Sequence, residues 1–139
     1  MRLTVATLCV IAGVLQGKEV VDFLEVMTSY DKTQADSAVT RAFERAGLTV
    51  ITNTPDLMEA EERKGSAFGG GKIERVVRAT VTVGDSTGIH FTAEEITHDR
   101  KGWITKRKRL SSKDHGDNGK FWEKVTAIVA GLDSAAHHR

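Results

Sequence analysis

The alternation of apolar and polar residues between Lys72 and Leu110 constrains the fold more than any other feature of the sequence. A strand places every second side chain on the same face, so this alternation predicts strands with one apolar face. Two turn-forming segments, Gly84–Gly88 and His98–Gly102, divide the stretch into three parts. We therefore expect three antiparallel strands in a meander, and the apolar face of the meander must be covered by other parts of the chain.

A first amphipathic helix is expected between Asp31 and Gly47. Asp31 and Gln34 have the spacing of a capping box, and Gly47 is a typical residue to follow a helix C-terminus. The apolar residues of this segment recur at spacings of three and four, on one stripe: Ala35, Ala38, Val39, Ala42, Phe43 and Ala46. Because most of them are small, we expect the helix to lie close to the sheet, with Phe43 as its main anchor.

The clearest helical pattern lies near the end of the sequence. Asp117 or Asn118 is expected to cap this second helix, and residues 133–139 are expected to fray. Its apolar stripe consists of Phe121, Trp122, Val125, Ile128, Val129 and Leu132. Since Phe121 and Trp122 are adjacent, either one belongs to the core and the other flanks it, or both line a groove between the helix and the sheet.

Three more segments are predicted as strands: Val20–Met27, Leu48–Thr52 and Leu57–Lys64. The last one is expected at an edge and leading into a hairpin, and the alternative for this segment is a solvated helical turn. The element order is then β-α-β-(β)-β-β-β-α. This order predicts an α+β fold in which two helices pack on one face of an antiparallel sheet of about four to six strands. We expect residues 18–139 to form this single domain.

Residues 1–17 differ from the rest because their only charge, on Arg2, precedes the uncharged run from Leu3 to Leu15. Such a run fits the apolar region of a signal peptide and is too short for a membrane span. We therefore expect residues 1–17 to be a signal peptide that directs the protein to the periplasm or the medium. The alternative is an unprocessed cytoplasmic chain in which the run is an ordinary strand or helix.

The order of elements resembles that of small α+β domains of the bacterial envelope, of the lipoprotein type, among them those of outer-membrane assembly lipoproteins. One local match is the end of the first helix with the following strand, Ala-Gly-Leu-Thr-Val at residues 46–50. The resemblance implies an envelope location and the same fold class. It assigns no functional residue.

The strongest local charge feature is a basic run around Trp103: Arg100, Lys101, Lys106, Arg107, Lys108, Arg109 and Lys113. Strand alternation would divide this run between two faces, which favours an edge strand that is protected against pairing with other chains. Glu94 and Glu95 on the preceding strand could neutralise part of it. The alternatives are an anionic lipid surface or, less expected, a nucleic acid.

No local pattern resembles a catalytic site. A small hydrolase would require His98, Asp99 and His115 to converge, and acid–base catalysis by the carboxylates at positions 59, 61 and 62 would require an apolar pocket. We expect these glutamates to keep an edge soluble. The single cysteine, Cys9, excludes an intramolecular disulfide. No cofactor and no metal are expected, and the formal net charge of +1 indicates no polyanionic partner.

The sequence thus predicts an exported, non-enzymatic domain that binds a protein or an envelope component. The candidate binding residues are Trp103, Lys106, Arg107, Lys108, Arg109 and Trp122. The alternative is a small-ligand or lipid carrier with a cleft between the C-terminal helix and the sheet, lined by Phe23, Phe43, Phe91, Trp103 and Trp122. Whether a second copy of the chain covers the outer sheet face, including Val76 and Ile96, is open at this stage.

Overall fold

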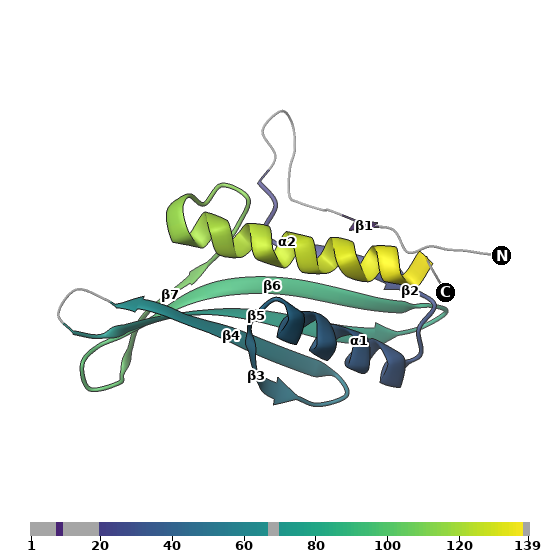
Figure 1. Cartoon of the computed structure of the whole chain (residues 1–139), viewed down its shortest axis with the longest axis horizontal. Coiled ribbons are helices and arrows are strands. Elements are labelled where there is room, and N and C mark those ends of the chain that lie inside the picture. Colours follow the sequence, from purple (N-terminus) through teal and green to yellow (C-terminus); the bar gives the residue numbers. More distant parts are fainter. Residues whose placement is uncertain (1–7, 10–19, 67–69, 138–139) are drawn as a thin grey trace.

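The described elements form an antiparallel sheet with two helices on one face (Figure 1). The computed structural model describes Leu8–Cys9 and residues 20–66 and 70–137. In chain order the elements are β1 (Leu8–Cys9), β2 (Leu24–Thr28), α1 (Lys32–Arg45), β3 (Thr49–Asn53), β4 (Leu57–Ser66), β5 (Lys72–Val83), β6 (Thr87–His98), β7 (Ile104–Arg109) and α2 (Gly116–His137). The predicted α+β class and the order from β2 to α2 are confirmed.

The sheet is built around β6. Its strand order is β1-β2-β6-β5-β4-β3, and β7 also pairs with β6. Residues Thr87–Phe91 of β6 pair with β2, and Glu94–His98 pair with β7, so these two strands follow one another along the same edge of β6. The predicted signal peptide, residues 1–17, lies outside the described residues except for Leu8–Cys9, which pair with β2.

The predicted meander is confirmed as β5, β6 and β7. β5 and β6 pair over their whole lengths, from Lys72 opposite His98 to Val83 opposite Thr87. β4 forms the predicted hairpin with β5, but it does not lie at an edge, because β3 pairs with its other side. The prediction of an edge position was wrong since hydrophobic alternation within one strand does not identify its neighbours.

The core lies between the helices and one face of the sheet. The sheet contributes alternate residues of β2, β4, β5 and β6, and the helices contribute their apolar stripes. Phe43, Phe91 and Phe121 are the largest side chains that are fully buried. Phe43 is therefore the anchor that the sequence predicts, and both Phe121 and Trp122 are buried.

The two helices differ in how well their ends were predicted. The capping box of α1 is present: Asp31 Oδ1 accepts from the Gln34 N–H at 2.8 Å, and Gln34 Oε1 accepts from the Asp31 N–H at 2.9 Å. Helix α2 instead begins at Gly116, one residue before the expected caps, and continues to His137. The prediction that the helix frays from residue 133 is thus wrong for residues 133–137, which are helical.

A buried polar cluster holds the first turns of α2 to the sheet. Arg75 is only 5% exposed, and its guanidinium lies 3.5 Å from Glu95 Oε2. Arg75 Nε also donates to Asn118 Oδ1 at 2.7 Å, so this side chain binds the sheet and does not cap the helix. Beside it, Lys124 Nζ lies 2.6 Å from Glu62 Oε2. These contacts satisfy charges that would be costly to bury alone.

The face of the sheet opposite the helices carries a row of polar side chains that crosses five strands. Thr52 on β3 donates to Glu59 on β4 at 2.8 Å, and Glu59 also accepts from Arg78 on β5. Arg78 lies 3.9 Å from Glu94 on β6, which accepts from Arg107 on β7 at 2.8 Å. Burial would raise the pKa of Glu59, but the hydrogen bonds from Arg78 and Thr52 outweigh it and lower this pKa.

Val76 and Ile96 lie on the same face as this row, yet they are only 5% and 7% exposed. Their cross-strand neighbours carry long charged side chains: Glu61 and Glu94 lie opposite Val76, and Arg107 lies opposite Ile96. The aliphatic parts of such side chains can cover apolar neighbours. A second copy of the chain is therefore not needed to bury these two residues.

Replacing Glu95 by leucine leaves the buried Arg75 without its carboxylate, and we expect a loss of about 3 kcal/mol in the free energy of unfolding. The double change Arg75→Met and Glu95→Leu removes both charges and should restore most of this loss. Urea denaturation of the single and double variants measures the difference. Equal stability of the two variants would show that Arg75 does not depend on Glu95.

Candidate functional site

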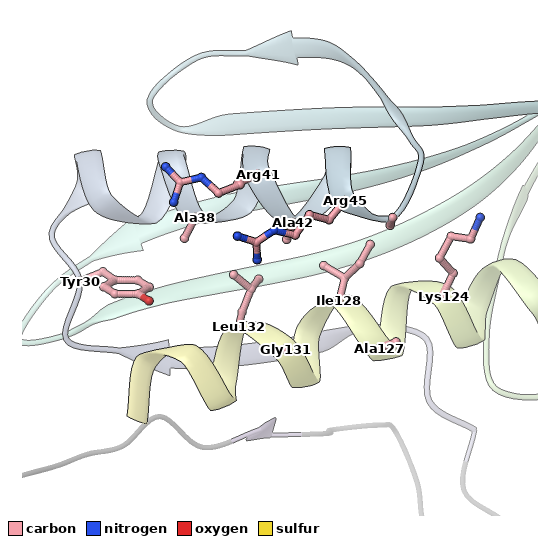
Figure 2. A pocket seen from close by; sticks show the side chains of 11 residues that line it. Tyr30, Ala38, Arg41, Ala42, Arg45, Lys124, Ala127, Ile128, Gly131 and Leu132 are labelled. Atoms are coloured by element: carbon pink, nitrogen blue, oxygen red, sulfur yellow. The ribbon is translucent and has the colours of Figure 1, made fainter. Parts of the chain in front are cut away.

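A groove of about 520 Å³ lies between α1 and α2 (Figure 2). We call it the helix groove. Its lining comes from a residue two positions before α1, from one stripe of α1 and its C-cap, and from one stripe of α2: Tyr30, Ala38, Arg41, Ala42, Arg45, Ala46, Lys124, Ala127, Ile128, Gly131 and Leu132. Tyr30 lies at one end of the groove and Lys124 at the other.

Small side chains create the groove. Ala38 and Ala42 of α1 and its C-cap, Ala46, recur at every fourth residue and therefore share one side of the helix. On α2, Ala127 and Gly131 have the same spacing. Side chains this short cannot fill the space between two helices that both rest on the sheet. The sequence predicts close contact of the helix alanines with the sheet, whereas only Ala35 among them is fully buried.

The helix groove combines an apolar floor with positive charge. Ile128 and Leu132 are buried in the core and form apolar lining. The charged lining residues Arg41, Arg45 and Lys124 are all cations. Figure 2 shows the Arg45 guanidinium between the two helices, above Leu132. A molecule with an apolar body and an anionic head fits this combination.

The three cations differ in their partners. Lys124 forms the ion pair with Glu62. Arg41 and Arg45 are exposed, and within the described part of the chain neither forms an ion pair or a side-chain hydrogen bond. Both guanidinium groups therefore retain their donors for an anion, and guanidinium can bind carboxylate or phosphate through two hydrogen bonds.

The cleft that the sequence predicts between the C-terminal helix and the sheet is filled with side chains. Phe43 and Phe91 are fully buried in the core, together with Trp122. Phe23 stacks on the ring of His90, with the ring centroids 4.6 Å apart. The position of this predicted cleft was thus wrong, because Trp122 and the phenylalanines pack closely. Trp122 also cannot serve as a surface contact.

Strand β7 divides its basic residues between the two faces, as predicted. Arg107 pairs with Glu94, and Arg109 Nη2 lies 3.9 Å from Asp22 Oδ2. Lys108 Nζ lies 2.6 Å from Asp114 Oδ1. The hydrogen bond that Lys108 donates to Asp114, and next the charge of this carboxylate, raise the pKa of Lys108. Three of the candidate binding residues on this strand therefore already have carboxylate partners.

The other two candidates on this part of the chain have a different environment. Lys106 is exposed and has no carboxylate partner among the described residues. Trp103, in the turn that precedes β7, is 70% exposed, and the neighbouring Ile104 is 47% exposed. The basic run thus separates into a paired part along β7 and an unpaired part near the turn.

His98 connects this turn to the sheet. Its Nε2 lies 2.8 Å from Glu74 Oε1 and its Nδ1 lies 3.2 Å from the Gly102 carbonyl oxygen. The contact with Glu74, and next the one with Gly102, raises the pKa of His98. These contacts occupy both ring nitrogens, so the hydrolase hypothesis that joined His98 and Asp99 to His115 gains no support.

No family model matches the sequence, and no curated protein matches it. Neither of the described helices is both long enough and apolar enough to cross a membrane. Among the described residues, no group of three or more His, Cys, Asp and Glu side chains could hold a metal ion.

The contact between His98 and Glu74 predicts a dependence of stability on pH. Because the pKa of His98 is raised on folding, its stabilising contribution is complete below the unfolded pKa of about 6.5 and is lost as the pH rises through the folded value. We expect Glu74→Gln to lower the pKa of His98, measured by NMR titration of the imidazole. The variant should lose more stability at about pH 6 than at about pH 9. An unchanged pKa would contradict this role of Glu74.

Proposed function

We propose that this chain is a non-enzymatic binding domain that holds a small amphipathic anion in the helix groove. The observation that carries the proposal is the pairing of an apolar floor with two exposed arginines that lack carboxylate partners among the described residues. This is the small-ligand alternative that the sequence predicts, but with the binding site between the two helices instead of between a helix and the sheet.

The charge pattern favours an anion over a neutral or cationic ligand. Arg41 and Arg45 lie four residues apart on α1 and flank the alanines that line the groove. Like charges at this spacing repel each other and weaken the isolated helix by a few tenths of a kcal/mol. An anionic head between the two guanidinium groups removes this repulsion and gains charge-assisted hydrogen bonds.

The size of the helix groove also supports a small ligand. Pockets for drug-sized molecules enclose roughly 300 to 1,000 Å³, and the volume of about 520 Å³ lies within this range. An alkyl chain can lie against Ile128 and Leu132, where the alanines and Gly131 leave room for it. The ligand class is therefore an alkyl or isoprenoid carboxylate or phosphate.

We further propose that the domain acts outside the cytoplasm. The support is the uncharged run from Leu3 to Leu15 behind Arg2, which has the character of a signal peptide. An exported binding domain can meet amphipathic anions that derive from envelope lipids.

Octyl phosphate, kept below its micelle concentration, is a suitable probe for the helix groove. We expect the double variant Arg41→Gln and Arg45→Gln to bind it about tenfold more weakly than the natural chain, because each lost charge-assisted contact at an exposed site contributes about 1 kcal/mol or less. Isothermal titration calorimetry measures the affinity. Octyl glucoside, which has the same alkyl chain and no charge, should bind both proteins equally.

Two further variants separate the groove from general charge. Lys113→Gln with Lys120→Gln removes the same charge away from the groove and should leave octyl phosphate binding unchanged. Gly131→Leu should abolish binding by filling the groove, since a Cβ at Gly131 meets no atom within 4 Å. This variant should still fold, because glycine costs a helix about 1 kcal/mol relative to good helix formers. Undiminished binding by Gly131→Leu would refute the site.

Export predicts a specific change in mass. In the host cell, the protein recovered from an envelope or secreted fraction should lack about 17 N-terminal residues. Intact-mass spectrometry of separated cell fractions measures this. A full-length protein found only in the cytoplasmic fraction would refute the proposed location and leave the groove proposal to be judged on ligand binding alone.

A further inference from the structure

The turn between β6 and β7 presents exposed apolar and basic side chains together. We call this region the tip and define it by Arg100, Lys101, Trp103, Ile104 and Lys106. All five side chains are exposed, and Trp103 and Ile104 belong to the few large apolar residues of the described chain that are more than a third exposed. Because Trp103 and Ile104 are both exposed, the tip has apolar surface that a partner can cover.

We propose that the tip docks on the surface of an anionic phospholipid bilayer, with Trp103 and Ile104 inserted at headgroup level and the cations facing lipid phosphates. This inference does not depend on the helix groove, because the two regions share no residue. It concerns a membrane surface, whereas the groove concerns a single soluble molecule.

The exposure of Trp103 is imposed by an ordered turn. One carboxylate oxygen of Asp99 accepts from the Lys101 N–H at 2.9 Å and from the Trp103 N–H at 3.0 Å. The Asp99 N–H donates to the Trp103 carbonyl at 2.9 Å, and Gly102 has a φ of 92° that suits glycine. The backbone on both sides of the indole is therefore fixed, and little ordering entropy remains to be lost when Trp103 binds.

The base of the tip is held against the neighbouring hairpin. A Cβ on Gly71 would lie 1.9 Å from the His98 carbonyl oxygen. The β4–β5 hairpin and the β6–β7 turn therefore approach each other so closely that only glycine fits at this position. The side chain of Arg100 also lies close to Gly70, since a Cβ on Gly70 would lie 3.2 Å from Arg100 Cγ. Exposed Lys72 at the start of β5 adds a further cation opposite His98.

Positive charge dominates this end of the sheet. Lys101, Lys106 and Lys72 form no ion pair with the described residues. The carboxylates nearest in sequence to Lys101 and Lys72 already have partners. Asp99 accepts hydrogen bonds from two backbone N–H groups of the turn, and Glu74 contacts His98. Each basic residue near an anionic membrane surface strengthens binding about fivefold at moderate ionic strength.

A bilayer fits the tip better than a nucleic acid does. Stacking on a base would use Trp103 but would leave the adjacent Ile104 exposed to water. At a membrane, an indole favours the headgroup region and an aliphatic neighbour gains by entering the acyl boundary. The paired arginines of β7 are directed to Glu94 and Asp22, so few cations remain to follow a phosphate backbone.

Binding of the full chain to vesicles tests the proposal. Vesicles of equimolar phosphatidylglycerol and phosphatidylcholine should sediment with the protein and shift the emission of exposed Trp103 to shorter wavelength, while buried Trp122 contributes a constant signal. Vesicles of phosphatidylcholine alone should bind at least tenfold more weakly. Trp103→Ser with Ile104→Ser should lose about tenfold in binding. Lys101→Gln with Lys106→Gln should lose about 25-fold, from about fivefold for each lysine.

The matched control is Lys113→Gln with Lys120→Gln, which removes the same charge from two exposed lysines outside the tip and outside the helix groove, and it should bind vesicles like the natural chain. Near-ultraviolet circular dichroism of Trp122 verifies that each variant is folded. Failure of the natural chain to bind either vesicle would overturn the proposal, as would full binding by the Trp103 and Ile104 variant. Tighter binding to a single-stranded oligonucleotide than to the anionic vesicles would overturn it in favour of a nucleic-acid surface.

Discussion

β5 and β6 pair over twelve residues each, and the position of most other elements depends on this pairing. β4 pairs with the other edge of β5, and β2 and β7 pair one after the other along the other edge of β6. Because side chains alternate along paired strands, the same register also decides which face becomes the core and which carries the polar row from Thr52 to Arg107. The two helices then cover the apolar face, and the distance between them determines the helix groove.

Local patterns in the sequence predicted the elements well. The alternation in β5 and β6, the capping box at Asp31 and the apolar stripe of α2 each reflect a periodicity or a short-range hydrogen bond that a few neighbouring residues specify. The errors concern relations between elements. The position of β4 inside the sheet depends on β3. Asn118 does not take its expected capping role, because its side-chain oxygen accepts a hydrogen bond from the buried Arg75, 43 positions away in the sequence.

The candidate sites were predicted less completely for the same reason. Helical spacing of Ala38, Ala42 and Ala46 was visible, but the sequence alone did not say whether this stripe faces the sheet or the other helix. Arginines that repeat at the same spacing beside the alanines were the available signal for a groove with charge at its rim. For the basic run, the strand alternation predicted the division between faces, and Glu94 neutralises Arg107 as expected. The separate character of Trp103 required the geometry of its turn.

Two hydrogen bonds join the segment before β2 to the segment that follows β7. Ser112 donates its N–H to the Val21 carbonyl at 2.8 Å, and the Val21 N–H donates to Ser112 Oγ at 2.9 Å, although the two residues are 91 positions apart. Together with the pairing of β2 and β6, this means that the sheet is complete only after β7, which ends at Arg109, has been synthesised. Contacts between such distant residues slow folding. β2 therefore stays without its main neighbour in the sheet until β6, which begins at Thr87, has been synthesised.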